Sequence, residues 1–130
     1  MLPRVRGLRY NADMLENILG TPTAAAIMLH LIHFGEVHAR DLAKDLDVTL
    51  SDMQEQLETY EESEVLISSK SGTTRRYVFN KKSPYTRPLM DLIRVQYNSM
   101  SEAEKEQYFQ PRVAARRGSK AAGRSRAGEN

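Results

Sequence analysis

The sequence predicts a mainly helical domain that carries one small antiparallel β-hairpin. Three observations support this fold class. Apolar residues recur at helical spacing in several segments, most of which follow a residue suited to capping a helix. One later stretch places apolar and polar residues in strand-like order on both sides of a polar tip. The chain has 130 residues, which is enough for one core and too short for a doubly wound sheet or an eight-stranded α/β barrel.

The first two helices are expected within the first third of the chain. A short first helix has Asn11 or Asp13 as its cap and ends at Gly20. Its apolar residues are Met14, Leu15, Ile18 and Leu19. The second helix has Thr21 to accept hydrogen bonds from free amides and Pro22 at the first helical position. The residues on its apolar face and at its end are Ile27, Leu31, Phe34 and Gly35.

A short helix, a tight turn and a third main helix follow. The short helix begins after Val37 and turns at Asp47. Its apolar residues are Ala39, Leu42, Ala43 and Leu46. Thr49 is placed to cap the third main helix, and Asp52 three residues later forms a weaker version of the capping box. The buried stripe of this helix consists of Met53, Leu57 and Tyr60.

The second half of the chain predicts a hairpin and two further helices. The hairpin has an apolar strand at residues 65 to 68, a tip near Gly72 and a returning strand that contains Tyr77 and Phe79. Pro88 is placed to open a helix over residues 88 to 100. Its apolar residues are Leu89, Leu92, Ile93, Val95, Tyr97 and Met100. A last short helix has Ser101 and Glu104 at the spacing of a capping box and ends before Pro111.

The order helix, helix, turn, helix, hairpin over residues 21 to 80 resembles the winged helix-turn-helix proteins. The segment AKDLDVTLSDMQEQL carries this resemblance, because its small and apolar residues match the contacts between the helices of that family. Asp47 stands where the family commonly has glycine, and aspartate tolerates the left-handed conformation better than most residues do. The phrase RRYVFNKKSPYTRPLMDLI also looks like the wing exit and following helix of bacterial and archaeal winged-helix regulators.

The resemblance implies a DNA-binding transcription regulator. In such proteins the third helix, here about residues 49 to 63, enters the major groove, and the wing, here about residues 65 to 80, contacts the phosphate backbone or the minor groove. The basic wing also fits another interpretation, a solvated hairpin edge that its charges protect from strand pairing. The candidate DNA-binding residues are Thr49, Ser51, Asp52, Glu55, Lys70, Arg75, Arg76, Lys81 and Lys82.

The charge of the third helix opens an alternative. Residues 48 to 64 contain six carboxylates and no lysine or arginine, so phosphates repel this segment. Residues 70 to 94, in contrast, contain seven bases and one acid. Either the helix reads DNA weakly while basic flanks supply the affinity, or the domain is a protein-interaction module whose acidic third helix docks a basic protein partner.

The chain divides into three parts by composition. Residues 1 to 10 form a basic N-terminal arm, residues 11 to 110 form the winged-helix domain with its flanking helices, and residues 111 to 130 form a basic tail. The tail has six bases and no aromatic residue, so we expect it to be disordered. The wide apolar surface of residues 88 to 100 predicts a homodimer with one face on the domain and the other on a symmetry mate. The alternative is a monomer in which the amino-terminal helix, with Leu15, Ile18 and Leu19, covers that second face.

Several classes of function are disfavoured. The absence of cysteine removes disulfides and thiolate metal sites, and it suits a cytoplasmic protein. His30, His33 and His38 lack a recognised ligand spacing, so we expect no metal and no cofactor. No glycine-rich phosphate loop, GxSxG or HExxH motif is present, so we expect no enzyme. No apolar run has the length of a spanning helix, so we expect no membrane partner.

Overall fold

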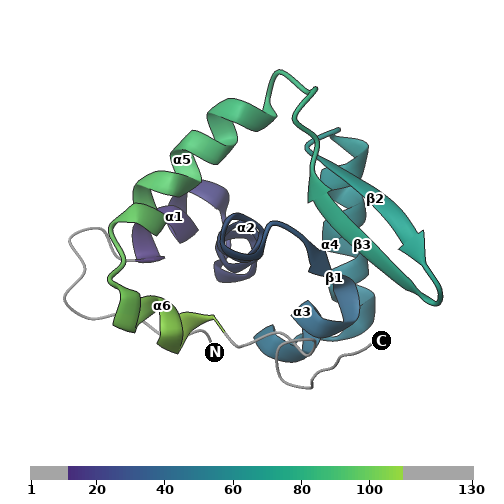
Figure 1. Cartoon of the computed structure of the whole chain (residues 1–130), viewed down its shortest axis with the longest axis horizontal. Coiled ribbons are helices and arrows are strands. Elements are labelled where there is room, and N and C mark those ends of the chain that lie inside the picture. The colour runs from purple at the N-terminus through teal and green to yellow at the C-terminus, as the bar shows by residue number, and fades with distance from the viewer. Residues whose placement is uncertain (1–11, 110–130) are drawn as a thin grey trace.

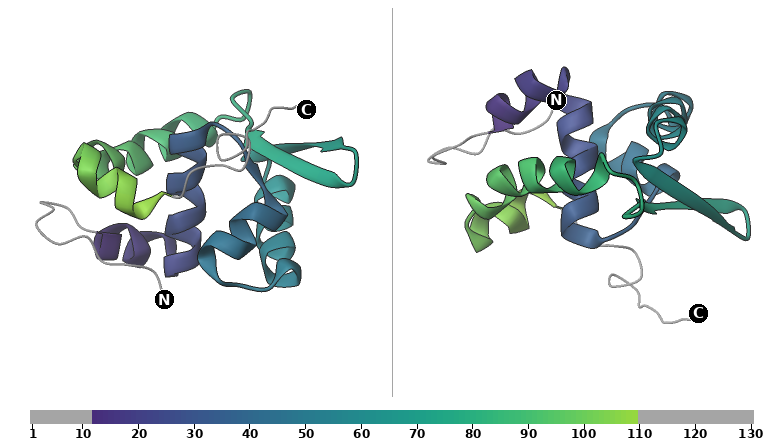
Figure 2. Two further views of the ribbon diagram at one scale, coloured as in Figure 1. Left: turned by 60° about the horizontal axis from the view of Figure 1, so that its bottom comes forward. Right: turned by 90° about the horizontal axis from the view of Figure 1, so that it is seen from above.

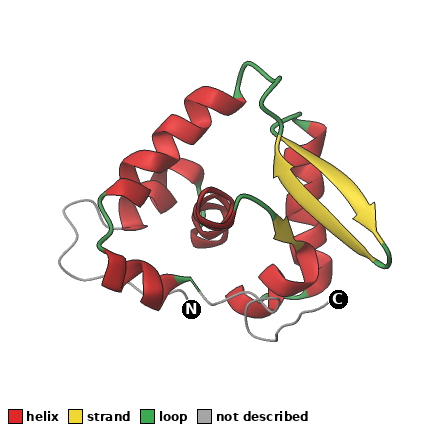
Figure 3. Ribbon diagram, in the orientation of Figure 1, coloured by secondary structure: helices red, strands yellow, loops and turns green. Residues whose placement is uncertain are grey.

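The structure is a computed structural model that describes residues 12–109. In this part of the chain six helices pack together, and a three-stranded sheet lies at one side of them (Figures 1 and 3). The helices are α1 (Ala12–Leu19), α2 (Pro22–Phe34), α3 (Ala39–Leu46), α4 (Leu50–Glu62), α5 (Thr86–Asn98) and α6 (Glu102–Tyr108). The strands are β1 (Val37–His38), β2 (Leu66–Ser71) and β3 (Thr74–Phe79). The predicted arm and tail, and Asn11 as a cap, lie outside the described residues.

Helix α2 is the centre of the fold. Eight consecutive residues, from Ala24 to Leu31, are buried. Because an α-helix turns about 100° per residue, eight buried residues in a row cover every side of it. Figure 1 looks nearly along α2 and shows the other helices arranged around it. Both predicted ends are confirmed, since Thr21 accepts a hydrogen bond from the Ala24 amide at 3.1 Å and Gly35 is left-handed with φ of 83°.

Helices α3 and α4 form the predicted helix-turn-helix. Asp47 adopts the left-handed conformation, with φ of 57°, as the resemblance requires of a residue that replaces glycine. The turn closes through a hydrogen bond of 3.0 Å from the Val48 amide to the Ala43 carbonyl. Thr49 accepts from the Asp52 amide at 3.0 Å, so its predicted capping role is confirmed. Met53 and Leu57 are buried and set which face of α4 points outward.

The hairpin is confirmed, and it belongs to a sheet with one strand more than the sequence predicts. The strand order is β1-β3-β2 and both pairs are antiparallel. Val37 of β1 lies opposite Tyr77 of β3. A strand of two residues is too short to show an alternating pattern, which is why the sequence does not reveal β1. We call the β2–β3 hairpin, residues 66 to 79, the wing.

The start of α5 differs from the predicted one, and one of the two alternative caps of α1 is excluded. Helix α1 begins at Ala12, so Asp13 lies inside it and is not its cap. Helix α5 begins at Thr86, two residues before Pro88, because a proline in the first turn removes only an amide that has no helical partner. Helix α6 ends at Tyr108, before Pro111, as predicted. Its predicted capping box is confirmed, with Ser101 and Glu104 bonded to each other's backbone amides at 3.1 and 2.6 Å.

Helix α6 is fastened to α2 by aromatic rings. The His33 ring stacks on Phe109 with centroids 4.1 Å apart, and its Nδ1 is hydrogen bonded to the Tyr97 hydroxyl at 2.8 Å. The buried His30 donates from Nδ1 to the Ala26 carbonyl at 2.6 Å. Both histidines thus take part in packing. No helix within residues 12–109 is long and apolar enough to cross a lipid bilayer.

The wide apolar surface of α5 is largely used inside the molecule. Helix α5 packs on α2 and also contacts α1, whose Leu15 is buried. Leu92 is half-buried against the core, whereas Val95 is 55% exposed. On α1, Met14 and Ile18 are 49% and 61% exposed. The apolar surface that remains open on these two helices is therefore formed by Met14, Ile18 and Val95.

The enclosure of α2 predicts a large difference between two isoleucines. Ile27 is fully buried in α2, so Ile27→Ala is expected to lower the free energy of unfolding by about 3 kcal/mol. Ile67 on β2 is 48% exposed, so Ile67→Thr, which keeps the β-branch, is expected to change it by less than about 0.5 kcal/mol. Urea unfolding measures both. Equal losses in the two variants would contradict the packing described above.

Candidate nucleic-acid interface

Two neighbouring elements present exposed polar side chains on one side of the molecule, helix α4 and the wing. The wing extends away from the helices, as the view from above in Figure 2 shows most clearly. Helix α4 packs against β2, and α3 packs against β3. The base of the wing is therefore held by both helices of the helix-turn-helix, and its tip is free of them.

The outward side of α4 is polar along its whole length. Its exposed residues are Ser51, Asp52, Gln54, Glu55, Glu58, Thr59 and Glu62. The predicted base-reading residues Thr49, Ser51, Asp52 and Glu55 are all exposed at the beginning of the helix. Gln54 was not predicted, although it lies three residues after Ser51 and so shares its face. Its amide can both donate to and accept from base edges, which no carboxylate does.

Four carboxylates make this outward side electronegative. We call Asp52, Glu55, Glu58 and Glu62 the acidic face; all four are exposed. The effect reaches the base of the wing. Burial raises the pKa of the Tyr77 hydroxyl, Glu61 raises it further, Arg75 lowers it and Glu58 raises it. The Tyr77 hydroxyl therefore lies where the carboxylates of α4 and the guanidinium of Arg75 come together.

A basic groove lies between the wing, α3 and the beginning of α4. The hollow has a volume of about 210 Å³. Its lining residues are Ala39, Arg40, Leu50, Gln54, Glu58, Lys70, Thr73, Thr74, Arg75 and Tyr77. Three of these are cations and one is a carboxylate. Arg40 was not predicted as a site residue. It is exposed on α3, and the only sign of this in the sequence is its place two residues before the apolar Leu42, which is buried.

The fold separates Arg75 from Arg76. Successive residues of a strand point to opposite faces, so the two neighbours do not act as one cluster. Arg75 donates to the Ser68 hydroxyl at 2.9 Å, and this hydroxyl donates to Glu61 at 2.7 Å. Arg76 instead forms an ion pair of 2.9 Å with Glu36. Both partners are partly exposed, so this pair contributes at most about 1 kcal/mol, but it holds Arg76 beside β1.

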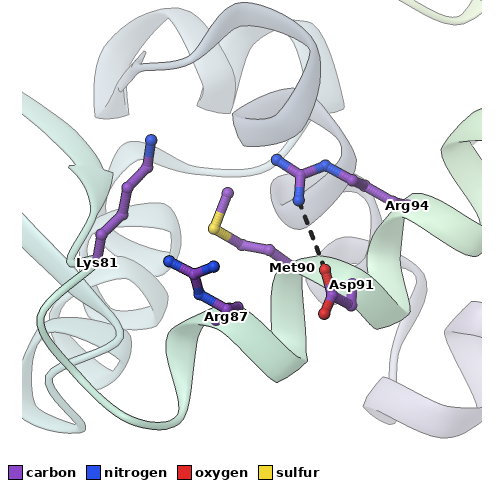
Figure 4. A pocket seen from close by; sticks show the side chains of 5 residues that line it. All are labelled: Lys81, Arg87, Met90, Asp91 and Arg94. Carbon is purple, nitrogen blue, oxygen red and sulfur yellow. Dashed lines mark ion pairs between the residues drawn. The ribbon is translucent and has the colours of Figure 1, made fainter.

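Lys81 and Lys82 lie at the other end of the wing from Lys70. The register pairs Ser71 with Thr74 at the tip and Leu66 with Phe79 at the base. Five residues of strand separate the two ends by about 17 Å. Lys81 instead lines a separate hollow with residues of α5 (Figure 4). The basic groove and the hollow lined by Lys81 are thus two separate basic regions.

The described residues also bear on metal binding. Within residues 12–109 no group of three or more histidine, aspartate and glutamate side chains is placed to hold a metal ion.

The chain was also compared with known proteins and solved structures. No model of a known protein family matches the chain, and no curated protein matches it. Among solved structures, the chain is similar to the crystal structure of the AntR antimony-specific transcriptional repressor, with a TM-score of 0.48 and 20% sequence identity. The match covers 72% of this chain and 80% of that chain. The fold itself follows from the order and packing of α2, α3, α4 and the wing: it is a winged helix-turn-helix with flanking helices at both ends.

Proposed function

We propose that this protein binds double-stranded DNA as a transcription regulator. The observation that carries the proposal is the basic groove, where Arg40, Lys70 and Arg75 meet beside the beginning of α4. A helix whose N-terminal end enters the major groove brings its first turn to the base edges. The three cations then lie beside it, where the sugar-phosphate backbone borders the groove.

In this arrangement affinity and sequence reading come from different elements. Phosphate contacts by Arg40, Lys70 and Arg75 supply sequence-independent affinity, because they release counterions from the duplex. Ser51, Gln54 and Glu55 face the bases. Since a carboxylate only accepts hydrogen bonds, Glu55 selects a base that offers an amino group in the major groove, which cytosine and adenine do. The assignment of Arg76, Lys81 and Lys82 to this interface stays a prediction.

Salt dependence tests the basic groove. Lys70→Gln and Arg75→Gln are each expected to reduce the slope of log affinity against log salt by about 0.9, and the double variant by about 1.8. Arg76→Gln is the matched control, because Arg76 is adjacent in sequence yet paired with Glu36 on the other face, and its effect is expected to be smaller. Fluorescence anisotropy on a mixed-sequence duplex between 50 and 200 mM salt provides the measurement. An unchanged slope in the double variant would remove the wing from the interface.

A second candidate function rests on the acidic face. Asp52, Glu55, Glu58 and Glu62 are exposed on α4, which has no base of its own, and such a surface suits a basic protein partner. The two functions make opposite demands on this surface. A duplex is repelled by these carboxylates, and a basic partner is attracted by them.

Neutralising the acidic face distinguishes the two functions. Under the DNA proposal, Glu58→Gln with Glu62→Gln is expected to strengthen duplex binding several-fold at low salt, because phosphate repulsion is removed. Glu102→Gln, an exposed carboxylate on the distant α6, serves as the control and is expected to have a smaller effect. Weaker or unchanged duplex binding in the double variant would count against α4 lying in the groove. It would favour the protein-interaction module.

We also propose that the protein forms a homodimer through α1 and α5. Met14, Ile18 and Val95 are exposed apolar residues on two helices that contact each other. A two-fold interface uses the same surface on both subunits, so this patch would pack against its own copy. A two-fold dimer presents two α4 helices to successive turns of a duplex, about 34 Å apart, and so reads a roughly palindromic site.

Sedimentation tests the dimer. The unaltered chain is expected at about twice its mass of 14.8 kDa at micromolar concentration, and Ile18→Glu with Val95→Glu is expected to dissociate it. Ile67→Glu is the control, since Ile67 is an exposed isoleucine on the wing rather than on α1 or α5. A clean 14.8 kDa species for the unaltered chain would overturn the dimer.

A further inference from the structure

A second basic hollow lies between the base of the wing and α5, away from the basic groove. Its volume is about 240 Å³. Figure 4 shows Lys81 reaching from the loop after β3 toward a row of side chains on α5. This row consists of Arg87, Met90, Asp91 and Arg94. We propose that this α5 hollow binds a small oxyanion with two or more negative charges, such as a phosphate or a compact polycarboxylate.

The charges in the α5 hollow are unbalanced. It contains three cations and one carboxylate. The carboxylate of Asp91 is 3.7 Å from Arg94 and accounts for that one charge. Neither Lys81 nor Arg87 forms an ion pair with any residue between 12 and 109. Two positive charges therefore remain without a partner in this part of the chain, and a dianion would balance them.

The fold fixes the backbone positions from which the cations extend. Arg87 and Arg94 are seven residues apart on α5, which is two turns or about 10.5 Å along one side of the helix. Lys81 is held opposite them by its neighbour Asn80. The Asn80 amide donates to the Val65 carbonyl at 2.8 Å, and its side chain donates to the Glu64 carbonyl at 2.9 Å. The backbone therefore needs no rearrangement when the anion binds, and the entropic cost is that of ordering the Lys81 and Arg87 side chains.

The size and lining of the α5 hollow limit the ligand class. Pockets for drug-sized ligands have volumes of roughly 300 to 1,000 Å³, so a hollow of about 240 Å³ suits a smaller molecule. Guanidinium groups bind carboxylate and phosphate through two parallel hydrogen bonds, and an ammonium adds a point charge. Met90 lies between the cations and offers no hydrogen bond donor of comparable strength. These features favour a compact oxyanion over a nucleotide.

The DNA backbone is another source of the same phosphate chemistry. The α5 hollow, however, lies at the base of the wing, about 17 Å from the tip along the strands. A phosphate in the basic groove does not reach it. The phosphate that binds in the basic groove therefore does not also fill the α5 hollow, and the test below distinguishes a free oxyanion from the rest of the duplex backbone.

The test is a titration of the full chain with inorganic pyrophosphate, followed by NMR at the arginine side chains. We expect saturable shifts of the Arg87 and Arg94 Nε–H signals in the unaltered protein. Lys81→Gln with Arg87→Gln is expected to weaken pyrophosphate binding at least tenfold, as read from the Arg94 signal and from calorimetry. Both residues are exposed, so the fold is expected to survive, and circular dichroism checks this.

Lys44→Gln, an exposed lysine on α3, is the matched control and should leave pyrophosphate binding unchanged. The proposal is overturned if millimolar pyrophosphate leaves the Arg87 and Arg94 signals unmoved, or if Lys44→Gln weakens binding as much as the double variant. A double variant that loses duplex affinity while the unaltered protein ignores pyrophosphate would also overturn it. That result would assign the α5 hollow to the DNA backbone.

Discussion

Helix α2 imposes one constraint on the whole molecule, because it is apolar on every side and must be covered on every side. The helix-turn-helix covers part of it through α3 and β1, and α1 and α5 cover more. The His33 and Phe109 rings then attach the end of α6. The flanking helices are therefore parts of the core. A shorter winged-helix chain without them would expose the same apolar helix to water.

This enclosure also decides where the charges lie. Burial of Met53 and Leu57 turns the acidic face of α4 outward, and the sheet register places Lys70 opposite Arg75 at the tip of the wing. Positive and negative surfaces then meet at Arg75. This residue lines the basic groove and also a neighbouring hollow, distinct from the α5 hollow, whose other charged residues are Glu58, Glu61 and Glu62. Under the proposed function, the wing therefore adds affinity for a duplex and the acidic face of α4 subtracts from it.

The parts of the fold that were predictable are those with local signals. Thr21, Thr49 and Ser101 cap helices within three residues of themselves, so each helix start is legible without knowledge of the rest. The left-handed turn at Asp47 is equally local. Strand β1 was missed because it exists only through its pairing with β3, almost forty residues away. The start of α5 at Thr86 was not predicted, because proline is common at the first helical position. Pro88 is instead the third residue of the helix, where its missing amide also costs no helical hydrogen bond.

The candidate site was predictable only in composition. The sequence shows that the wing is basic, but the separation of Arg75 from Arg76 depends on Glu36, forty residues earlier. Arg40 joins the wing only through the packing of α3 on β3. The two basic regions likewise follow from the sheet register and the path of the loop after it. Such information is tertiary and leaves no pattern along the chain.

Strand β1 has a mechanical consequence for the wing. It pairs with β3 only at Arg76 and Tyr77, so the sheet has three strands at these two residues and two strands on either side of them, toward the tip and toward the base. The outer part, which contains Lys70, Gly72 and Thr74, is a two-stranded ribbon that the rest of the sheet holds at one end only. Two-stranded ribbons twist more readily than wider sheets, so bending is expected just beyond the residues of β3 that pair with β1. The charged tip can then adjust to the surface of a binding partner, while the part of β3 that pairs with β1 keeps its position relative to α2.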